Sequence, residues 1–352
     1  MNNENQKISI TWDDLNKVKV DQPLPAAMSV HRAIKTSSNP TPGRVSSERL
    51  FMKAWFYLGL AGFFGAFLAW MICEPTFEDG VKDGWGNNIM FPLVVTLMCV
   101  LFGTVESLVE RTWYRASLRA LESAFYGVLF GFFFDFIANF IFAILLQSLR
   151  ASGVTHLLSN PLLWLARAIA WAVFGMAAGL VFGIVSKSGK KTSYGILGGV
   201  IGAAIGGFLF DPITLLTGLG GGAEVSRAIG FSILGSTTGI AIGLVESALK
   251  ERWLYVTGGP LAGKQFVLYQ DQVTMGKLPS STIYLFKDPE ILQQHAIIEK
   301  RSGRSLITAF GPVLIAGHVL QSQMQRILNN GDVIQIGRYT FTYAEKERSM
   351  PQ

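Results

Sequence analysis

Six apolar stretches between residues 54 and 249 are each long enough to cross a lipid bilayer. They cover residues 54–73, 89–109, 124–146, 162–186, 192–212 and 228–249. A bilayer core needs about 20 consecutive apolar residues per helix, and it holds no water to bind backbone amides, so the segments that cross it must be helical. The sequence therefore predicts a helical membrane bundle. Only 15% of the residues are charged, which agrees with this prediction because soluble domains usually have about 25%.

Basic residues are concentrated in alternate loops, which predicts the orientation of the spans. They gather before the first span and after the second, fourth and sixth spans (Lys53; Arg111, Arg115 and Arg119; Lys187, Lys190 and Lys191; Lys250 and Arg252). By the positive-inside rule, we expect a multi-pass protein of the cytoplasmic (inner) membrane with both termini in the cytoplasm. The formal net charge of +6 is then an orientation signal, and no nucleic-acid partner is expected.

The chain is expected to consist of four parts. Residues 1–48 are polar and lack the apolar core of a signal peptide, so they are predicted to form a disordered cytoplasmic tail. The six spans then occupy residues 49–250, a strand-rich region occupies residues 251–346, and residues 347–352 form a short tail. Both cysteines lie in apolar segments, which predicts neither a disulfide nor a metal site.

The spans repeat as three tandem hairpins of two helices each. Arg167-Ala-Ile opens the fourth span and Arg227-Ala-Ile opens the sixth span. Glycines follow at matching positions (Gly175, Gly179 and Gly183; Gly235, Gly239 and Gly243), and the first helices of the hairpins share an aromatic start (Tyr57, Tyr126 and Tyr194). Glycines at every fourth position form one helix face that lets two backbones approach closely in lipid. We expect this packing inside one bundle; homo-oligomerisation through the glycine faces and a pore are alternatives.

Charged residues in the spans are candidates for a role in the membrane, because a charge in lipid is costly and is usually paired or functional. The candidates are Asp135, Arg167, Asp211 and Arg227. The repeat alignment places uncharged residues at the corresponding positions of the first hairpin, so both charges are absent together. We therefore expect one Asp–Arg ion pair inside each of the second and third hairpins. A proton or ion pathway is the alternative.

Beyond residue 251 the pattern changes to short alternating strands separated by turns. Trp253-Leu-Tyr-Val, Gln265-Phe-Val-Leu-Tyr and Tyr339-Thr-Phe-Thr-Tyr are strand-like, and Asn329-Asn-Gly-Asp is one of the turns between such segments. Many short strands with frequent turns predict an antiparallel β-sandwich.

Short motifs follow one another through this region in a definite order. They are Gly259-Pro-Leu-Ala-Gly263-Lys-Gln-Phe266, Gly276-Lys277, Asp288-Pro289 followed by His295, Ile315-Ala316-Gly317, and Gly331-Asp332-Val-Ile-Gln-Ile-Gly337. In this order they resemble the forkhead-associated (FHA) domain, and the resemblance covers nearly the whole of residues 251–346. It implies an FHA-like sandwich whose loops at one end bind phosphothreonine peptides.

The resemblance also implies binding positions, and three of them depart from the family pattern. Lys277 stands where the family has Arg, Leu292 where it has Ser, and Ala316 where it has Asn; His295, which braces the loop in the family, is kept. Lys lacks the planar two-point grip of Arg on phosphate, and Leu donates no hydrogen bond. Each lost charge-assisted hydrogen bond costs about 1.5–3 kcal/mol, so we expect a degenerate FHA module that binds protein without phosphate.

These features favour a membrane-anchored adaptor or scaffold that presents the module to a protein partner on the cytoplasmic side. One alternative is a channel or transporter that the module regulates. Another is a true phosphothreonine-binding protein that uses Lys277, Arg301 and Arg304. The catalytic motifs HExxH, GxSxG and CxxC do not occur, and the four histidines are scattered, so neither an enzyme nor a metal or other cofactor is expected.

Overall fold

The computed structural model describes residues 50–78, 84–153, 158–217, 222–286 and 288–346. The predicted tails at 1–48 and 347–352 lie outside the described residues. The bundle and the sandwich belong to one compact unit of the chain.

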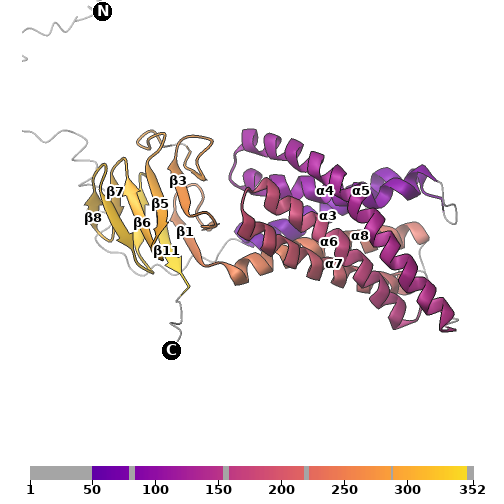
Figure 1. The fold of residues 1–352 in the computed structure, drawn as a ribbon. Helices are drawn as coiled ribbons and strands as arrows, with labels where there is room; N and C mark the ends of the chain where they lie inside the picture. The colour runs from indigo at the N-terminus through magenta and orange to yellow at the C-terminus, as the bar shows by residue number, and fades with distance from the viewer. Residues whose placement is uncertain (1–49, 79–83, 154–157, 218–221, 287, 347–352) are drawn as a thin grey trace, which may run out of the picture. The chain divides into compact units, whose positions relative to one another are not determined.

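Six long apolar helices form the bundle (Figure 1), and the prediction of six is confirmed. They are α3 (Ala54–Cys73), α4 (Trp85–Val109), α5 (Trp113–Ala151), α6 (Pro161–Val185), α7 (Gly189–Thr217) and α8 (Ala223–Leu249). Two 3-10 turns, η1 (Leu50–Met52) and η2 (Glu74–Thr76), flank α3. Each helix is long and apolar enough to cross a membrane.

Helix α5 is much longer than predicted. Its 39 residues correspond to about 58 Å at 1.5 Å per residue, whereas the apolar stretch covers only residues 124–146. The preceding segment was expected to be a basic loop, but α5 already begins at Trp113. The apolar pattern marks the part of a helix that suits lipid, and a polar helix can continue beyond it into water.

The six helices close into a ring. Each helix packs against its neighbours in sequence, and α8 returns to pack against α3. The glycines mark the closest approaches. Gly175 of α6 faces Gly199 of α7, and Gly235 of α8 faces Gly62 of α3; a Cβ atom at any of the four would collide with the opposite backbone. These glycine faces are buried inside the chain, so they do not offer a second copy the surface that the homo-oligomer alternative requires.

The contacts in which two glycines face one another join different hairpins. The pairs α6–α7 and α8–α3 each combine the second helix of one hairpin with the first helix of the next. The pair α4–α5 follows the same rule, because Gly103 of α4 lies against Ser123 of α5 and Gly127 of α5 lies against Cys99 of α4. The three hairpins therefore form a cyclic arrangement in which each repeat makes an equivalent contact with the next.

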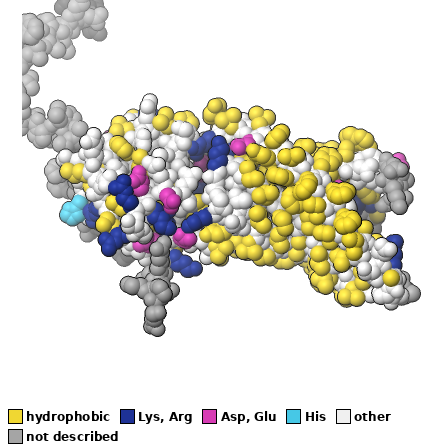
Figure 2. Space-filling model, viewed as in Figure 1, with side chains coloured by type: hydrophobic (Ala, Val, Ile, Leu, Met, Phe, Trp, Pro, Cys, Tyr) yellow, Lys and Arg dark blue, Asp and Glu magenta, His cyan; other side chains and the backbone are white. Residues whose placement is uncertain are grey.

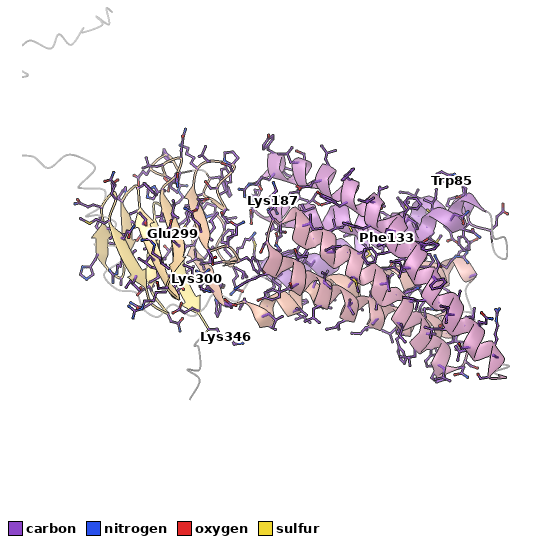
Figure 3. The ribbon with its side chains drawn as sticks, viewed as in Figure 1. Trp85, Phe133, Lys187, Glu299, Lys300 and Lys346 are labelled. Atoms are coloured by element: carbon purple, nitrogen blue, oxygen red, sulfur yellow. The ribbon has the colours of Figure 1, made fainter. Side chains whose placement is uncertain are left out.

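The face of the bundle is apolar where lipid would surround it. Figure 2 shows hydrophobic side chains over the helices. On helix α5, five phenylalanine side chains are exposed (Phe125, Phe132, Phe133, Phe136 and Phe140). Soluble monomers rarely expose apolar patches of this extent. Trp85 and Lys187 lie at opposite ends of the bundle (Figure 3).

Residues 252–345 form the predicted β-sandwich. Its strands are β1 (Arg252–Gly258), β2 (Gln265–Val267), β3 (Gln272–Gly276), β4 (Ile283–Tyr284), β5 (Ala296–Arg301), β6 (Arg304–Ala309), β7 (Val313–Ile315), β8 (His318–Leu320), β9 (Gln325–Leu328), β10 (Val333–Ile336) and β11 (Tyr339–Glu345). One sheet has the order β2-β1-β11-β10-β7-β8 and the other β4-β3-β5-β6-β9. The described strand pairs are antiparallel except β3–β4, which is parallel.

The sandwich core is filled by side chains that alternate along the strands. Leu254 of β1 and Tyr339, Phe341 and Tyr343 of β11 are fully buried between the sheets. Helix α8 ends at Leu249 and β1 begins at Arg252, so only two residues connect the bundle to the sandwich.

Candidate functional site

Strand register brings three loops together at one end of the sandwich. Met275 of β3 lies opposite Ala296 of β5, and Ala296 lies opposite Ala309 of β6. The residues that follow β3, precede β5 and follow β6 therefore meet at the same end. Backbone hydrogen bonds join them: Lys277 N–H donates to the Leu292 carbonyl at 3.0 Å, and Phe310 N–H donates to the His295 carbonyl at 2.8 Å.

His295 braces these loops from inside. Its side chain is buried, with 1% exposed. Leu292 N–H donates to His295 Nδ1 at 3.2 Å, and Nε2 lies 3.1 Å from the Pro312 carbonyl. A neutral imidazole with its proton on Nε2 satisfies both contacts. Gly311 is required beside it, because a Cβ atom there would lie 2.5 Å from His295 Cε1. This geometry agrees with the bracing role that the resemblance implies.

Several hydrophobic side chains are exposed at this end of the sandwich. Lys277 is exposed, and around it lie four exposed hydrophobic side chains, which we call the apolar tip (Leu278, Leu292, Phe310 and Met324). Met324 joins the group because Ala309 N–H donates to its carbonyl at 3.0 Å. Leu292 is 47% exposed and Met324 is 50% exposed. Apolar contact is therefore one interaction that this end can offer, beside Lys277 and the exposed side chains of Gln293 and Gln294 in the same loop as Leu292.

Ala316 does not belong to this end of the sandwich, which contradicts the prediction that it shares a binding site with Lys277. It forms a two-residue turn with Gly317 between β7 and β8, and both residues have positive φ, +47° and +82°. Ala316 N–H donates to the carbonyl of Val333, the first residue of β10. That strand start follows the end of β9, where Leu328 pairs with Ser305. Ala316 thus lies at the end opposite to Lys277.

Arg301 and Arg304 also lie at the opposite end, on either side of the β5–β6 turn. Arg301 lies five positions after Ala296 on β5, which is about 17 Å at 3.3 Å per residue. The two arginines therefore cannot share a phosphate with Lys277. The loop residue that completes the Lys277 end is Phe310, which the motifs did not indicate. Its position directly after a buried alternating strand was the available signal.

The Asp288-Pro289 motif is structural. Asp288 is 5% exposed, and its Oδ2 accepts a hydrogen bond from Arg338 N–H at 2.8 Å. Its Oδ1 accepts from Glu290 N–H at 3.1 Å. The carboxylate therefore holds the loop before β5 against the turn between β10 and β11.

The charged residues of the bundle pair differently from the prediction. Arg167 Nε lies 3.0 Å from Asp211 Oδ2, and Arg227 pairs with Glu74. The expected pairs inside the hairpins, Asp135 with Arg167 and Asp211 with Arg227, are therefore wrong. Both observed pairs join neighbouring hairpins, as do the contacts in which two glycines face one another.

The ring explains this pairing. Glu74 lies 17 residues after Tyr57, and Asp211 lies 17 residues after Tyr194, so the two acids are equivalent when the tyrosines set the alignment. The same position after Tyr126 is Ala143. Each arginine at the start of a second helix thus faces an acid on the first helix of the next repeat. The expected alignment had instead made Asp135 equivalent to Asp211 and left the first hairpin without a charge, and a sequence alignment also does not show which neighbour a position faces.

The Arg167–Asp211 pair is well shielded. Asp211 is 1% exposed, and the Arg167 guanidinium lies 5.0 Å from the centre of the Phe210 ring and 5.3 Å from that of Phe142. Aromatic faces attract a cation, so the arginine has partners on two helices. Among the described residues, Asp135 instead accepts a hydrogen bond from Asn139 on its own helix, at 2.9 Å.

Polar contacts fix the sandwich to the helix ends. Lys264 Nζ lies 2.7 Å from Glu110 Oε1, Arg115 of α5 donates to the Ser281 carbonyl, and Tyr269 donates to Glu246 of α8. Burial, followed by the nearby Glu246 carboxylate, raises the pKa of Tyr269 well above its usual value. The phenol therefore stays protonated and remains a donor.

Comparisons with known proteins place an FHA domain in this part of the chain. The FHA domain family matches residues 273–337. The chain is similar to the oxoglutarate dehydrogenase inhibitors of Corynebacterium diphtheriae, at 28% identity over 96 residues, and Corynebacterium jeikeium, at 29% identity over 90 residues. These matches cover 27% and 26% of this chain and span 66% and 62% of the two relatives, less than two thirds of each.

Two solved structures are also similar. The FHA domain of an Arabidopsis thaliana hypothetical protein is 24% identical, with 29% of this chain and 92% of that chain covered and a TM-score of 0.26. The N-terminal FHA domain of S. cerevisiae Rad53p, in complex with a phosphothreonine peptide, is 15% identical, with 27% and 94% covered and a TM-score of 0.26. The chain thus carries a C-terminal FHA domain after six long apolar helices.

Proposed function

We propose that this protein is a membrane-anchored adaptor whose FHA domain binds a protein partner on the cytoplasmic side without requiring phosphate. The apolar tip is the observation that carries the proposal. FHA domains bind phosphorylated partners, but this end of the sandwich presents Leu292 and Phe310 next to Lys277. Desolvating these side chains favours an apolar partner segment, whereas Leu292 offers a phosphate group no hydrogen-bond donor and Lys277 lacks the two-point grip of Arg.

The cytoplasmic orientation is supported by charge. The basic residues Lys187, Lys190 and Lys250 belong to the helix ends next to the sandwich, and Lys190 Nζ contacts Glu251 Oε2 at 2.8 Å. The positive-inside rule places that side of the bundle in the cytoplasm. Protease added to intact cells should leave the segment beyond Trp253 intact, and protease added to inverted vesicles should remove it. The reverse pattern would contradict the adaptor role.

The binding mode can be tested by site-specific photo-crosslinking in intact membranes. A photoreactive residue at Leu292 should capture a discrete partner, and the matched position Arg301, exposed at the opposite end of β5, should not. Phosphatase treatment before irradiation should leave the capture unchanged. Loss of capture after phosphatase would instead show a phosphothreonine-binding protein.

The channel or transporter alternative has weaker support. Arg167 and Asp211 satisfy one another, and paired charges that join helices favour a structural role over a conduction path. Solute flux into proteoliposomes that contain the purified protein would establish the alternative.

A further inference from the structure

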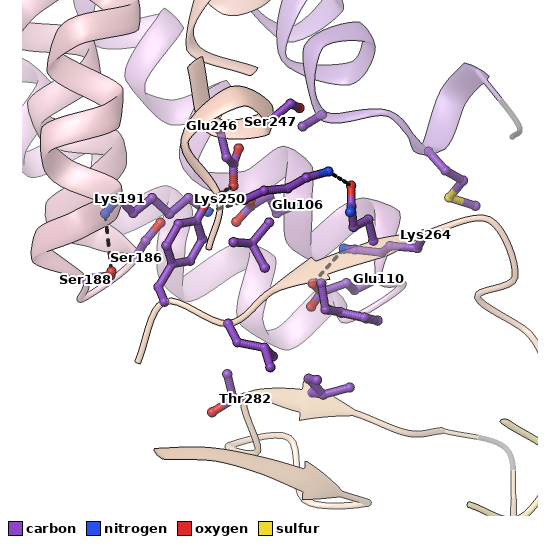
Figure 4. Close-up of a pocket in the computed structure, with 18 of the residues that line it drawn as sticks. Glu106, Glu110, Ser186, Ser188, Lys191, Glu246, Ser247, Lys250, Lys264 and Thr282 are labelled. Atoms are coloured by element: carbon purple, nitrogen blue, oxygen red, sulfur yellow. Dashed lines mark hydrogen bonds and ion pairs between the residues drawn. The ribbon is translucent and has the colours of Figure 1, made fainter. Parts of the chain in front are cut away.

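A cavity of about 440 Å³ lies between the helix ends and the sandwich (Figure 4). Its lining comes from α3, α4, α5, α7 and α8 and from strands β1 to β4 with their connections. Small-molecule sites usually measure about 300–1,000 Å³, so the cavity has the size of a ligand site. The apolar tip and the Arg167–Asp211 and Arg227–Glu74 pairs do not contribute to it.

The cavity lining has an excess of positive charge. Three carboxylates face it (Glu106, Glu110 and Glu246), along with six basic side chains (Lys53, Arg115, Arg119, Lys191, Lys250 and Lys264). Some of these charges satisfy one another, as Lys191 Nζ does with Glu106 Oε1 at 2.5 Å. Arg119 is held less tightly, because its Nη1 lies 3.5 Å from Glu106 Oε2 and its side chain is 27% exposed. The cavity can therefore accept an anion.

Glu246 presents to the cavity a carboxylate oxygen that has no hydrogen-bond donor among the described residues. Its side chain lines the cavity and is 5% exposed. One carboxylate oxygen, Oε1, accepts from the Tyr269 hydroxyl, whereas Oε2 is buried and has no hydrogen-bond partner among the described residues. A buried acceptor without a hydrogen-bond partner is unfavourable, because it has lost its contacts with water. A ligand that fits here must bring a hydroxyl or another donor as well as a negative charge.

The cavity also lies at a definite depth. Glu106 and Glu246 each precede the last residue of their helix by three positions, and Lys191 is the third residue of α7. These are the positions at which a spanning helix leaves the hydrocarbon and meets the lipid headgroups. Basic pockets between spanning helices on the cytoplasmic side bind anionic headgroups.

We propose that this cavity binds a phosphate ester that carries a hydroxyl group, supplied by the headgroup of an anionic membrane lipid. Arg119 contacts the phosphate, and the hydroxyl donates to Glu246 Oε2. A soluble phosphate ester has the same chemistry, and the experiment separates the two sources. The ligand would contact both the helix ends and the sandwich, so it would link the FHA domain to the membrane surface.

The test measures dissociation constants on the full-length protein in detergent by native mass spectrometry. The probes are dioctanoyl phosphatidylglycerol, which has a phosphate and free hydroxyls, dioctanoyl phosphatidylcholine, which has a phosphate but no donor, and glycerol 3-phosphate as the soluble ester. We expect phosphatidylglycerol to bind at least tenfold more tightly than phosphatidylcholine. Arg119→Gln and Glu246→Gln should each weaken it at least tenfold.

Matched controls come from the other ends of the same helices. Arg150→Gln on α5 and Glu224→Gln on α8 change exposed residues far from the cavity, and both should leave binding unchanged. Tight binding of glycerol 3-phosphate with the same dependence on Arg119 would support the site and identify a soluble ligand. Equal binding of the two lipids, or binding that is insensitive to Arg119→Gln, would overturn the proposal. If Glu246→Gln does not fold, the Arg119→Gln and lipid comparisons decide alone.

Discussion

The bundle and the sandwich are packed by different chemistry along one chain. The sandwich is held by large side chains, of which Tyr339, Phe341 and Tyr343 are fully buried. In the bundle the closest contacts are between glycines, such as Gly175 and Gly199. In water, burying large apolar groups stabilises a fold. Lipid is itself apolar, so helices in a membrane are stabilised mainly by close backbone approach and by polar pairs. The solvent therefore decides which residues can hold each region together.

The largest effect is expected from a substitution that unfolds the sandwich without unfolding the bundle. Phe341→Ala removes a fully buried ring and should cost about 3–5 kcal/mol. Calorimetry should show the sandwich transition lowered or lost while the helical circular dichroism signal is kept. The control Val333→Ala, at a residue 46% exposed on β10, should change little. Loss of the helical signal in Phe341→Ala would show that the two regions do not fold separately.

The next effect concerns the charges between hairpins. Arg167→Asp or Asp211→Arg leaves a buried charge unpaired and should cost about 3 kcal/mol. The double variant that carries both changes should recover most of that loss in thermal unfolding. The control double variant, Asp211→Arg with Arg227→Asp, should show no recovery because these residues are not partners in the structure. Recovery in the control would favour pairing inside the hairpin.

Gly199→Leu tests the glycine contacts of the bundle. The added side chain would meet the backbone of Gly175, and overpacking of this kind costs about 1–3 kcal/mol. The helices should unfold at a lower temperature while the sandwich transition is unchanged. Gly189→Leu at the start of the same helix, where a Cβ atom has no neighbour within 4 Å, should have no such effect. Equal effects of the two changes would refute the close approach.

A stabilising change is expected in the sandwich. Ala316 has a φ of +47°, a conformation that costs most residues about 1–2 kcal/mol but that Asn adopts readily. Ala316→Asn should therefore raise the sandwich transition by the equivalent of about 1 kcal/mol. Ala262→Asn, outside the residues with positive φ, should give no gain. Because Ala316 lies far from the apolar tip, the change should also leave partner capture at Leu292 unaltered.

The smallest effect is at the connection between the regions. The hydrogen bond from Lys190 holds the pKa of Glu251 below its ordinary value of 4.5. Because the folded pKa is lowered, the stabilisation is complete above that ordinary value and is lost as pH falls through the lowered pKa. The pair is about half exposed, so Glu251→Gln should cost less than about 1 kcal/mol. Unfolding temperatures of the two proteins should converge at low pH.

The sequence predicted the helices and strands themselves better than it predicted which of them contact one another. The six helices and the β-sandwich follow from apolar length and from alternation, which are local properties. The pairing of Arg167 with Asp211 depends on the ring, and the position of Ala316 depends on strand register. Both are long-range relations that motif order along a chain does not contain. Phe310 was missed for the same reason, since only register places it beside Lys277.

The two-residue connection between Leu249 and Arg252 limits where the FHA domain can act. An extended connection of this length spans at most about 10 Å. The domain therefore stays close to the membrane and cannot diffuse through the cytosol as a domain on a long flexible linker would. A partner that is itself confined to the membrane would meet it by diffusion in two dimensions and at a raised local concentration. A freely soluble partner would have to approach the bilayer surface to be captured.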